Sequence, residues 1–134
     1  MGDPWSEQSS VDAHGIRPPS VYAIETRTTP DGVVVLALEG EFDLAAAPAM
    51  RERLTAARAA GARGVVLDMT EVTFVDSSVL RELLRAEAQM QSEGVPLVIA
   101  ALRPPVARLL ELTHTAGLLK AAPTVAEAVQ RAAA

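Results

Sequence analysis

The sequence contains no cysteine and only two histidines among its 134 residues. The absence of thiols excludes a disulfide framework, a thiolate nucleophile and a cysteine-ligated metal site. Aromatic side chains make up only 3% of the residues, so the chain has almost no platforms on which nucleic-acid bases could stack. We therefore expect an aliphatic core, with no metal and no cofactor.

Positive charge is also in deficit, with 12 Lys and Arg residues against 17 Asp and Glu and a net charge of −5. An acidic chain of this kind has no electrostatic reason to bind nucleic acid or an anionic membrane. The apolar runs Val33 to Leu38 and Leu97 to Leu102 are too short to span a bilayer. Residues 1–20 lack the basic start and apolar segment of a signal peptide. We expect a cytoplasmic protein with no membrane association.

Two regions differ in composition. Residues 1–19 are rich in Ser, Gly, Asp and Pro without periodicity, which predicts a flexible N-terminal tail. Residues 20–134 carry most of the 49% hydrophobic content and are long enough for one domain with a real core.

Strand and helix patterns alternate through this second region. The patterning predicts five strands, over Val21–Thr28, Val33–Glu39, Ala62–Met69, Val95–Ala101 and Leu118–Ala121. Helices are expected to begin near Pro48, Asp76, Pro104 and Thr124 and the first three to end near Gly61, Ser92 and Gly117. This order predicts an α/β fold: a mainly parallel, mixed sheet of four to five strands, with an antiparallel N-terminal hairpin and about four helices.

The stretch from Val72 to Leu80 combines a β-prone apolar run with an acidic residue and two hydroxyls, immediately before a helical pattern. Asp76, Ser77 and Ser78 can each accept hydrogen bonds from the free N–H groups at a helix start. A serine at this point would lie near the positive end of the helix dipole, an environment that favours phosphate.

No pattern in the chain supports an enzyme. Asp43 and Asp76 lack an accompanying nucleophile and base, and His114 is expected to lie at the end of a helix. Gly61 and Gly64 lack the spacing of a phosphate-binding loop.

Several segments resemble the STAS domain of the anti-sigma factor antagonists, from about Val21 to the C-terminus. The resemblance is carried by Gly40-Glu41-Phe42-Asp43-Leu44, Pro48, Leu67-Asp68 and the run from Val72 through Asp76-Ser77-Ser78 to Leu80.

The resemblance implies a STAS-like fold and a regulator that acts by partner switching. Such a domain binds a kinase-type anti-sigma factor and thereby frees a sigma factor. The kinase then phosphorylates a serine at the start of the second helix, and a serine phosphatase can remove the phosphate. The accepting residue here would be Ser78, with Ser77 as the alternative, and Asp43 and Asp76 match acidic positions nearby.

We expect the partner to contact the start of the second helix and the neighbouring loop from Gly40 to Asp43. Val79 is expected to be an exposed apolar anchor within a charged rim. The expected contact residues are Gly40, Glu41, Asp43, Asp76, Ser77, Ser78, Val79, Arg81, Glu82 and Arg85.

One departure from the family pattern leaves alternatives open. The family usually has glycine where this chain has Val79, and a branched side chain there would obstruct a kinase. The chain could then be a STAS scaffold or constitutive binding module without phosphorylation. A third possibility is a sensor that binds a small molecule beside the second helix.

Overall fold

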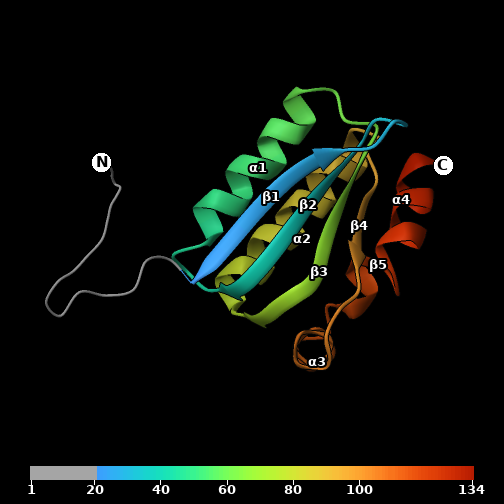
Figure 1. Cartoon of the computed structure of the whole chain (residues 1–134). Coiled ribbons are helices and arrows are strands. Elements are labelled where there is room, and N and C mark those ends of the chain that lie inside the picture. The colour runs from blue at the N-terminus through green and yellow to red at the C-terminus, as the bar shows by residue number, and fades with distance from the viewer. Residues whose placement is uncertain (1–20) are drawn as a thin grey trace, which may run out of the picture.

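The computed structural model describes residues 21–134, and the expected N-terminal tail lies outside these residues. The strands are β1 (Tyr22–Thr28), β2 (Val33–Phe42), β3 (Gly64–Val75), β4 (Leu97–Ala100) and β5 (Lys120–Ala122). The helices are α1 (Ala47–Ala59), α2 (Ser77–Ser92), α3 (Pro104–Leu112) and α4 (Val125–Ala133), with a short 3₁₀ turn at Ala116–Leu118 (Figure 1).

The five strands form one sheet in the order β1-β2-β3-β4-β5. β1 and β2 are antiparallel, and the other neighbours are parallel. The hairpin turn contains Gly32 at φ +87°, a conformation that glycine adopts without strain. This arrangement confirms the predicted mixed α/β sheet with its N-terminal hairpin and four helices.

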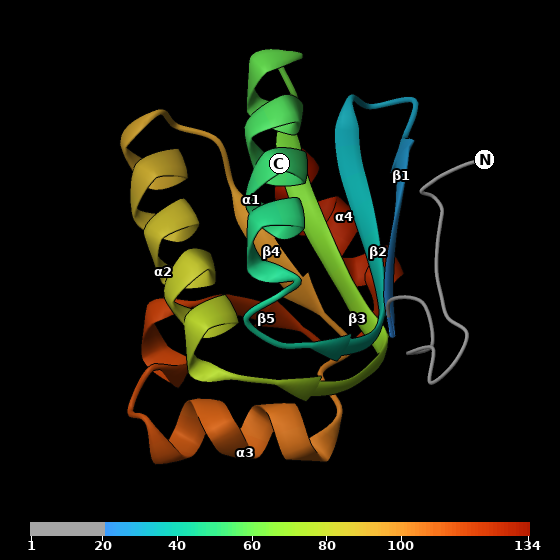
Figure 2. The same ribbon diagram turned by 90° about the vertical axis from the view of Figure 1, so that its left-hand side faces the viewer.

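Alternating side chains of β2 face two separate cores. Leu36 and Leu38 lie in the larger core, while Val33 and Val35 lie in the smaller one on the opposite face. Helices α1 and α2 cover the larger core, and α4 covers the smaller one (Figure 2). Because both faces of β2 are covered, its sequence is continuously apolar rather than alternating.

Two strands are longer than the sequence predicts. β3 runs as a single strand of 12 residues through to Val75, although only its first half is a continuous apolar run. β2 continues to Phe42, so Gly40 and Glu41 belong to a strand and not to the expected loop. The register with β3 shifts at Gly40, whose φ of +97° permits the irregularity and the continued pairing.

Helix α3 begins at Pro104 as expected but does not extend to Gly117. It ends at Leu112, and His114 adopts a positive φ of 59° just beyond it. The Thr113 hydroxyl donates to the carbonyl oxygen of Leu109 over 2.8 Å. A left-handed residue after the last turn is a common way to end a helix, and it redirects the chain toward β5.

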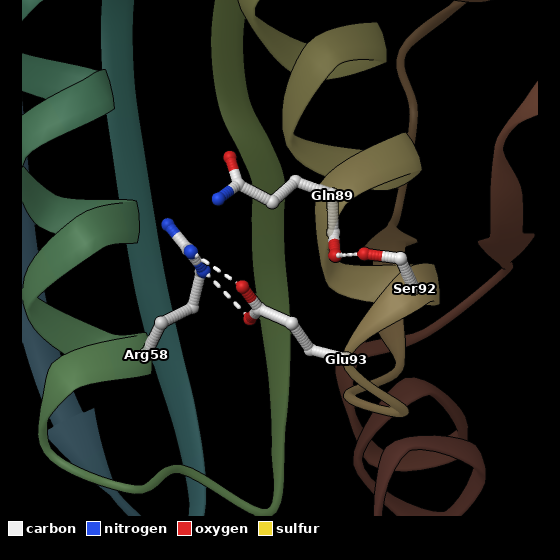
Figure 3. A network of polar contacts seen from close by, with 4 residues as sticks. All are labelled: Arg58, Gln89, Ser92 and Glu93. Carbon is white, nitrogen blue, oxygen red and sulfur yellow. Dashed lines mark hydrogen bonds and ion pairs between the residues drawn. The ribbon is translucent and has the colours of Figure 1, made fainter.

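The C-terminal ends of α1 and α2 are joined by a bidentate ion pair (Figure 3). Arg58 Nε and Nη2 donate to the two carboxylate oxygens of Glu93 over 3.0 and 2.7 Å. The hydrogen bonds from Arg58 lower the pKa of Glu93 and raise that of Arg58. The ion pair between Arg58 and Glu93 therefore links the C-terminal ends of the two helices.

Within residues 21–134, the helices are too short or too polar to cross a membrane.

The packing of α4 against the sheet depends on the close approach of its backbone to Gly64 in β3. A Cβ at Gly64 would lie 2.4 Å from the carbonyl oxygen of Ala132. We predict that Gly64→Ala lowers the free energy of unfolding by about 1–3 kcal/mol, because α4 must shift to admit the methyl group. Gly117→Ala is the control, since a Cβ there meets nothing within 4 Å. Urea unfolding of the two variants measures the difference, and equal stabilities would contradict the prediction.

Candidate partner-binding edge of the sheet

The loops that follow β2 and β3 meet at one edge of the sheet. These strands are parallel, and Phe42 and Val75 at their ends are paired in register. The backbone N–H of Asp76 donates to the carbonyl oxygen of Phe42 over 3.1 Å. The loop before α1 therefore lies beside the first turn of α2, as the lower part of Figure 2 shows.

Asp76 is the N-cap of α2. Its Oδ1 accepts hydrogen bonds from the backbone N–H groups of Ser78 and Val79, over 3.0 and 3.1 Å. The same oxygen accepts from the hydroxyl of Ser78 over 2.6 Å. Of the three capping candidates, the carboxylate of Asp76 thus satisfies the helix start.

The environment of Asp76 favours its ionised form. Burial is the largest single influence and raises its pKa, but four hydrogen bonds oppose that effect. The donors are the Ser78 hydroxyl and the backbone N–H groups of Val79, Ser78 and Leu44. Together they outweigh burial and leave the pKa of Asp76 below its ordinary value.

The two serines differ in their surroundings. Ser77 is exposed, whereas Ser78 is half-buried and its hydroxyl is held by Asp76. The N–H groups expected to be free beneath Ser78 are already bonded to Asp76. A negative group added to Ser78 would therefore meet a carboxylate first, rather than open backbone donors.

Val79 is not an exposed anchor, and that expectation was wrong. Its side chain is 1% exposed and packs in the larger core with Leu80 and Leu83. Because successive side chains point in different directions around a helix, Ser77 points outward and Val79 points toward the sheet. The branched side chain consequently adds no obstacle on the surface next to Ser78.

Leu44 and Phe74 are exposed apolar side chains at this edge that sequence reasoning missed. Leu44 is 70% exposed, and its backbone N–H bonds to the carboxylate of Asp76. Phe74 is 48% exposed and lies two residues before Asp76. Phe74 also lines a groove of about 210 Å³ with residues of α3 such as Leu109. The available signal for Leu44 was its place directly after Asp43, between the end of the strand pattern and the start of the helix near Pro48.

The charged residues of α2 have unequal roles. Arg81 and Arg85 are exposed, as expected for a contact face. Glu82 is only 13% exposed in its side chain and lies 3.9 Å from Arg51 of α1 and 3.6 Å from Arg85. Glu82 therefore contributes mainly to the contact between α1 and α2. Arg81 and Arg85 are the charged side chains of α2 that a partner could reach.

The remaining expected contact residues also approach the edge, with different exposure. Glu41 is exposed, while Gly40 is half-buried in β2. Asp43 is half-buried, and its Oδ1 accepts from the backbone N–H of Ala45 over 3.0 Å. Asp43 thus shapes the loop that presents Leu44.

The cavity beside α2 is small. It has a volume of about 100 Å³ and is lined by residues of α1 and α2, including Arg51, Arg85 and Gln89. Ligand sites usually measure about 300–1,000 Å³, so this cavity gives the small-molecule sensor little support. Among residues 21–134, no three His, Asp or Glu side chains are grouped to hold a metal ion.

Residues 24–128 match the STAS domain family. Over 83 residues the chain is 32% identical to BtrV of Bordetella bronchiseptica, which is named as an anti-sigma factor antagonist; the match covers 62% of this chain and 72% of BtrV. The chain belongs to the STAS domain family of anti-sigma factor antagonists. The expected family and its fold are confirmed.

Solved structures share the fold of this STAS domain. An anti-sigma factor antagonist from Mycobacterium paratuberculosis has a TM-score of 0.76 at 24% identity, covering 86% of this chain and 97% of that protein. SpoIIAA in its unphosphorylated form has a TM-score of 0.69 at 22% identity, covering 81% and 95%. The phosphorylated form of the Bacillus protein has a TM-score of 0.64 at 21% identity, covering 81% and 98%.

The N-cap of α2 generates a pH-dependent prediction. We expect Asp76→Ala to cost about 1 kcal/mol of unfolding free energy at neutral pH, because the helix loses its cap. Since the pKa of Asp76 is lowered by folding, its ionisation stabilises the protein above about pH 4 and this contribution is lost as the pH falls through the folded pKa. The difference in unfolding free energy between wild type and Asp76→Ala should therefore become smaller as the pH is lowered.

Urea unfolding at neutral pH and at about pH 3.5, just under the ordinary Asp value, measures this difference. Glu52→Ala, at an exposed position on α1, is the control and should change stability by less than about 0.5 kcal/mol at either pH. If Asp76→Ala lowers the unfolding free energy by the same amount at both pH values, folding does not lower the pKa of Asp76.

Proposed function

We propose that this STAS domain is a non-enzymatic anti-sigma factor antagonist. It binds a kinase-type anti-sigma factor through the surface formed by the β2–α1 loop and the first turns of α2, and so frees a sigma factor. Phosphorylation of Ser78 ends this binding, and a serine phosphatase restores it. The observation that carries the proposal is the Ser78 hydroxyl at the start of α2, held 2.6 Å from Asp76 beside the exposed Leu44.

The geometry around Ser78 provides a physical reason for switching. The hydroxyl proton forms the hydrogen bond to Asp76, and a phosphorylated oxygen has no such proton. The phosphate adds roughly −1.5 to −2 charges at neutral pH next to a carboxylate that is itself kept ionised. Repulsion would turn the phosphoserine outward, toward the space that a partner occupies.

The contact surface has the composition of a protein interface. Leu44 and Phe74 provide exposed apolar area, and Arg81 and Arg85 provide charge on the accessible side of α2. Interfaces of this kind combine an apolar centre with a polar rim. The inward orientation of Val79 leaves the approach to Ser78 open, which favours the phosphorylated switch over a constitutive binder.

Phosphorylation is the first test. We predict that incubation with the kinase-type anti-sigma factor of the same genome and ATP adds one phosphate, about 80 Da by intact mass, and that Ser78→Ala abolishes the gain. Ser77→Ala is the matched control and should still be phosphorylated, since it leaves the Ser78 hydroxyl in place. The phosphorylated form should bind the anti-sigma factor about 100-fold more weakly, because like charges meet in the interface. Binding with no mass gain would instead indicate a constitutive binding module.

The apolar anchor is the second test. We predict that Leu44→Asp weakens binding to the anti-sigma factor by at least about tenfold, because a charge replaces an exposed apolar contact. Leu118→Asp is the control: Leu118 is 61% exposed but precedes the edge strand β5, away from the β2–α1 loop. Calorimetric titration of both variants measures the effect. Equal affinities for the two would move the interface away from Leu44.

A further inference from the structure

Among residues 21–134, β1 is an edge strand of seven residues whose one neighbour in the sheet is β2. It lies at the outer side of the sheet in both views (Figures 1 and 2). The opposite edge strand, β5, has only three residues. A strand of this length with one unpaired side offers backbone donors and acceptors to another chain.

The direction of these backbone groups follows from two hydrogen bonds at the ends of the hairpin. Thr29 N–H donates to the carbonyl oxygen of Val33, and Glu41 N–H donates to that of Val21. In an antiparallel pair, the residues that bond to the neighbour alternate along the strand. The odd-numbered residues of β1 therefore bond to β2, and the N–H and C=O groups of Ile24, Thr26 and Thr28 point outward.

The side chains beside Thr26 carry opposite charges. Thr26 faces α1, where its hydroxyl accepts from Arg53 Nη1 over 2.7 Å. Glu25 and Arg27 therefore project from the other face of the strand, and both are exposed. Neither forms an ion pair with another residue in the described range 21–134.

We propose that β1 pairs with β1 of a second copy of this chain, antiparallel and centred on Thr26. A two-fold axis at Thr26 places Glu25 of each copy opposite Arg27 of the other. It also aligns the outward groups of Ile24, Thr26 and Thr28 into about six backbone hydrogen bonds. The two sheets then join into one continuous sheet of ten strands, twice the five of one copy.

The charges select this register over its neighbours. An axis at Glu25 or at Arg27 would place identical charges opposite each other, which is unfavourable. Those axes would also centre on residues whose backbone groups already bond to β2. An axis at Thr26 pairs the outward-pointing backbone groups and also places opposite charges next to each other.

Two features limit the strength of the dimer. The two Arg53 side chains approach each other on the α1 face, because each bonds to a Thr26 on the axis. The paired strands are also short, and small interfaces are usually transient. The dimer is therefore concentration-dependent and weakened by charge changes on β1. It does not rest on the proposed function, because it uses the flank of the sheet and leaves Ser78 uncovered.

Sedimentation velocity of the full chain, from micromolar to millimolar concentration, tests the dimer. Wild type should shift from monomer toward dimer with rising concentration. Glu25→Arg should remain monomeric at every concentration, and the double change Glu25→Arg with Arg27→Glu should restore the dimer. Glu111→Arg on the exposed surface of α3 changes the net charge equally and should dimerise as wild type does.

The register is tested by cross-linking, since the natural chain contains no cysteine. In the proposed pairing, the two Thr26 Cα atoms lie about 5.5 Å apart. Thr26→Cys should be cross-linked efficiently by a short bismaleimide. Ala23→Cys should not, because six positions of offset separate the two cysteines by about 20 Å.

The proposal is overturned if wild type stays monomeric at millimolar concentration or if Glu25→Arg dimerises as wild type does. Failure of the charge swap to restore the dimer, or equal cross-linking at positions 23 and 26, also overturns it. The cross-link needs no charge change, so it decides the question even if Glu25→Arg fails to fold.

Discussion

One carboxylate organises the functional edge of this protein. Asp76 caps α2, holds the Ser78 hydroxyl and accepts the N–H of Leu44, while its own N–H bonds to the end of β2. These contacts join the first turn of α2 to the end of β2 and to the loop before α1. The positions of Ser78 and of the loop that presents Leu44 therefore both depend on Asp76.

This arrangement changes how a phosphate would act at Ser78. A helix start normally attracts anions because its first N–H groups are unpaired. In this domain the carboxylate of Asp76 already occupies two of them. Phosphorylation would thus create a conflict between two negative groups at the protein surface, and it would disturb local structure as well as repel a partner.

The two interactions that we propose use separate surfaces of the domain. Ser78 lies at the end of the sheet where the loops after β2 and β3 meet, whereas Glu25 and Arg27 lie on the edge strand β1. α1 lies over the hairpin side of the sheet and contacts both regions, through Arg53 to β1 and through Arg51 to Glu82 of α2. Assembly and partner binding could therefore coexist on one domain.

The sequence by itself determined the order of strands and helices, the N-terminal hairpin and the polar start of α2, because these follow from local periodicity and capping. It also pointed to Ser78 through a family resemblance. Only the tertiary structure decided that Val79 is buried and Leu44 exposed, because the direction of a side chain at a helix start depends on where the sheet lies beneath it. The extension of β2 through Gly40 and the outward backbone groups of β1 likewise became visible only with strand pairing, since a single segment does not specify which neighbour satisfies its hydrogen bonds.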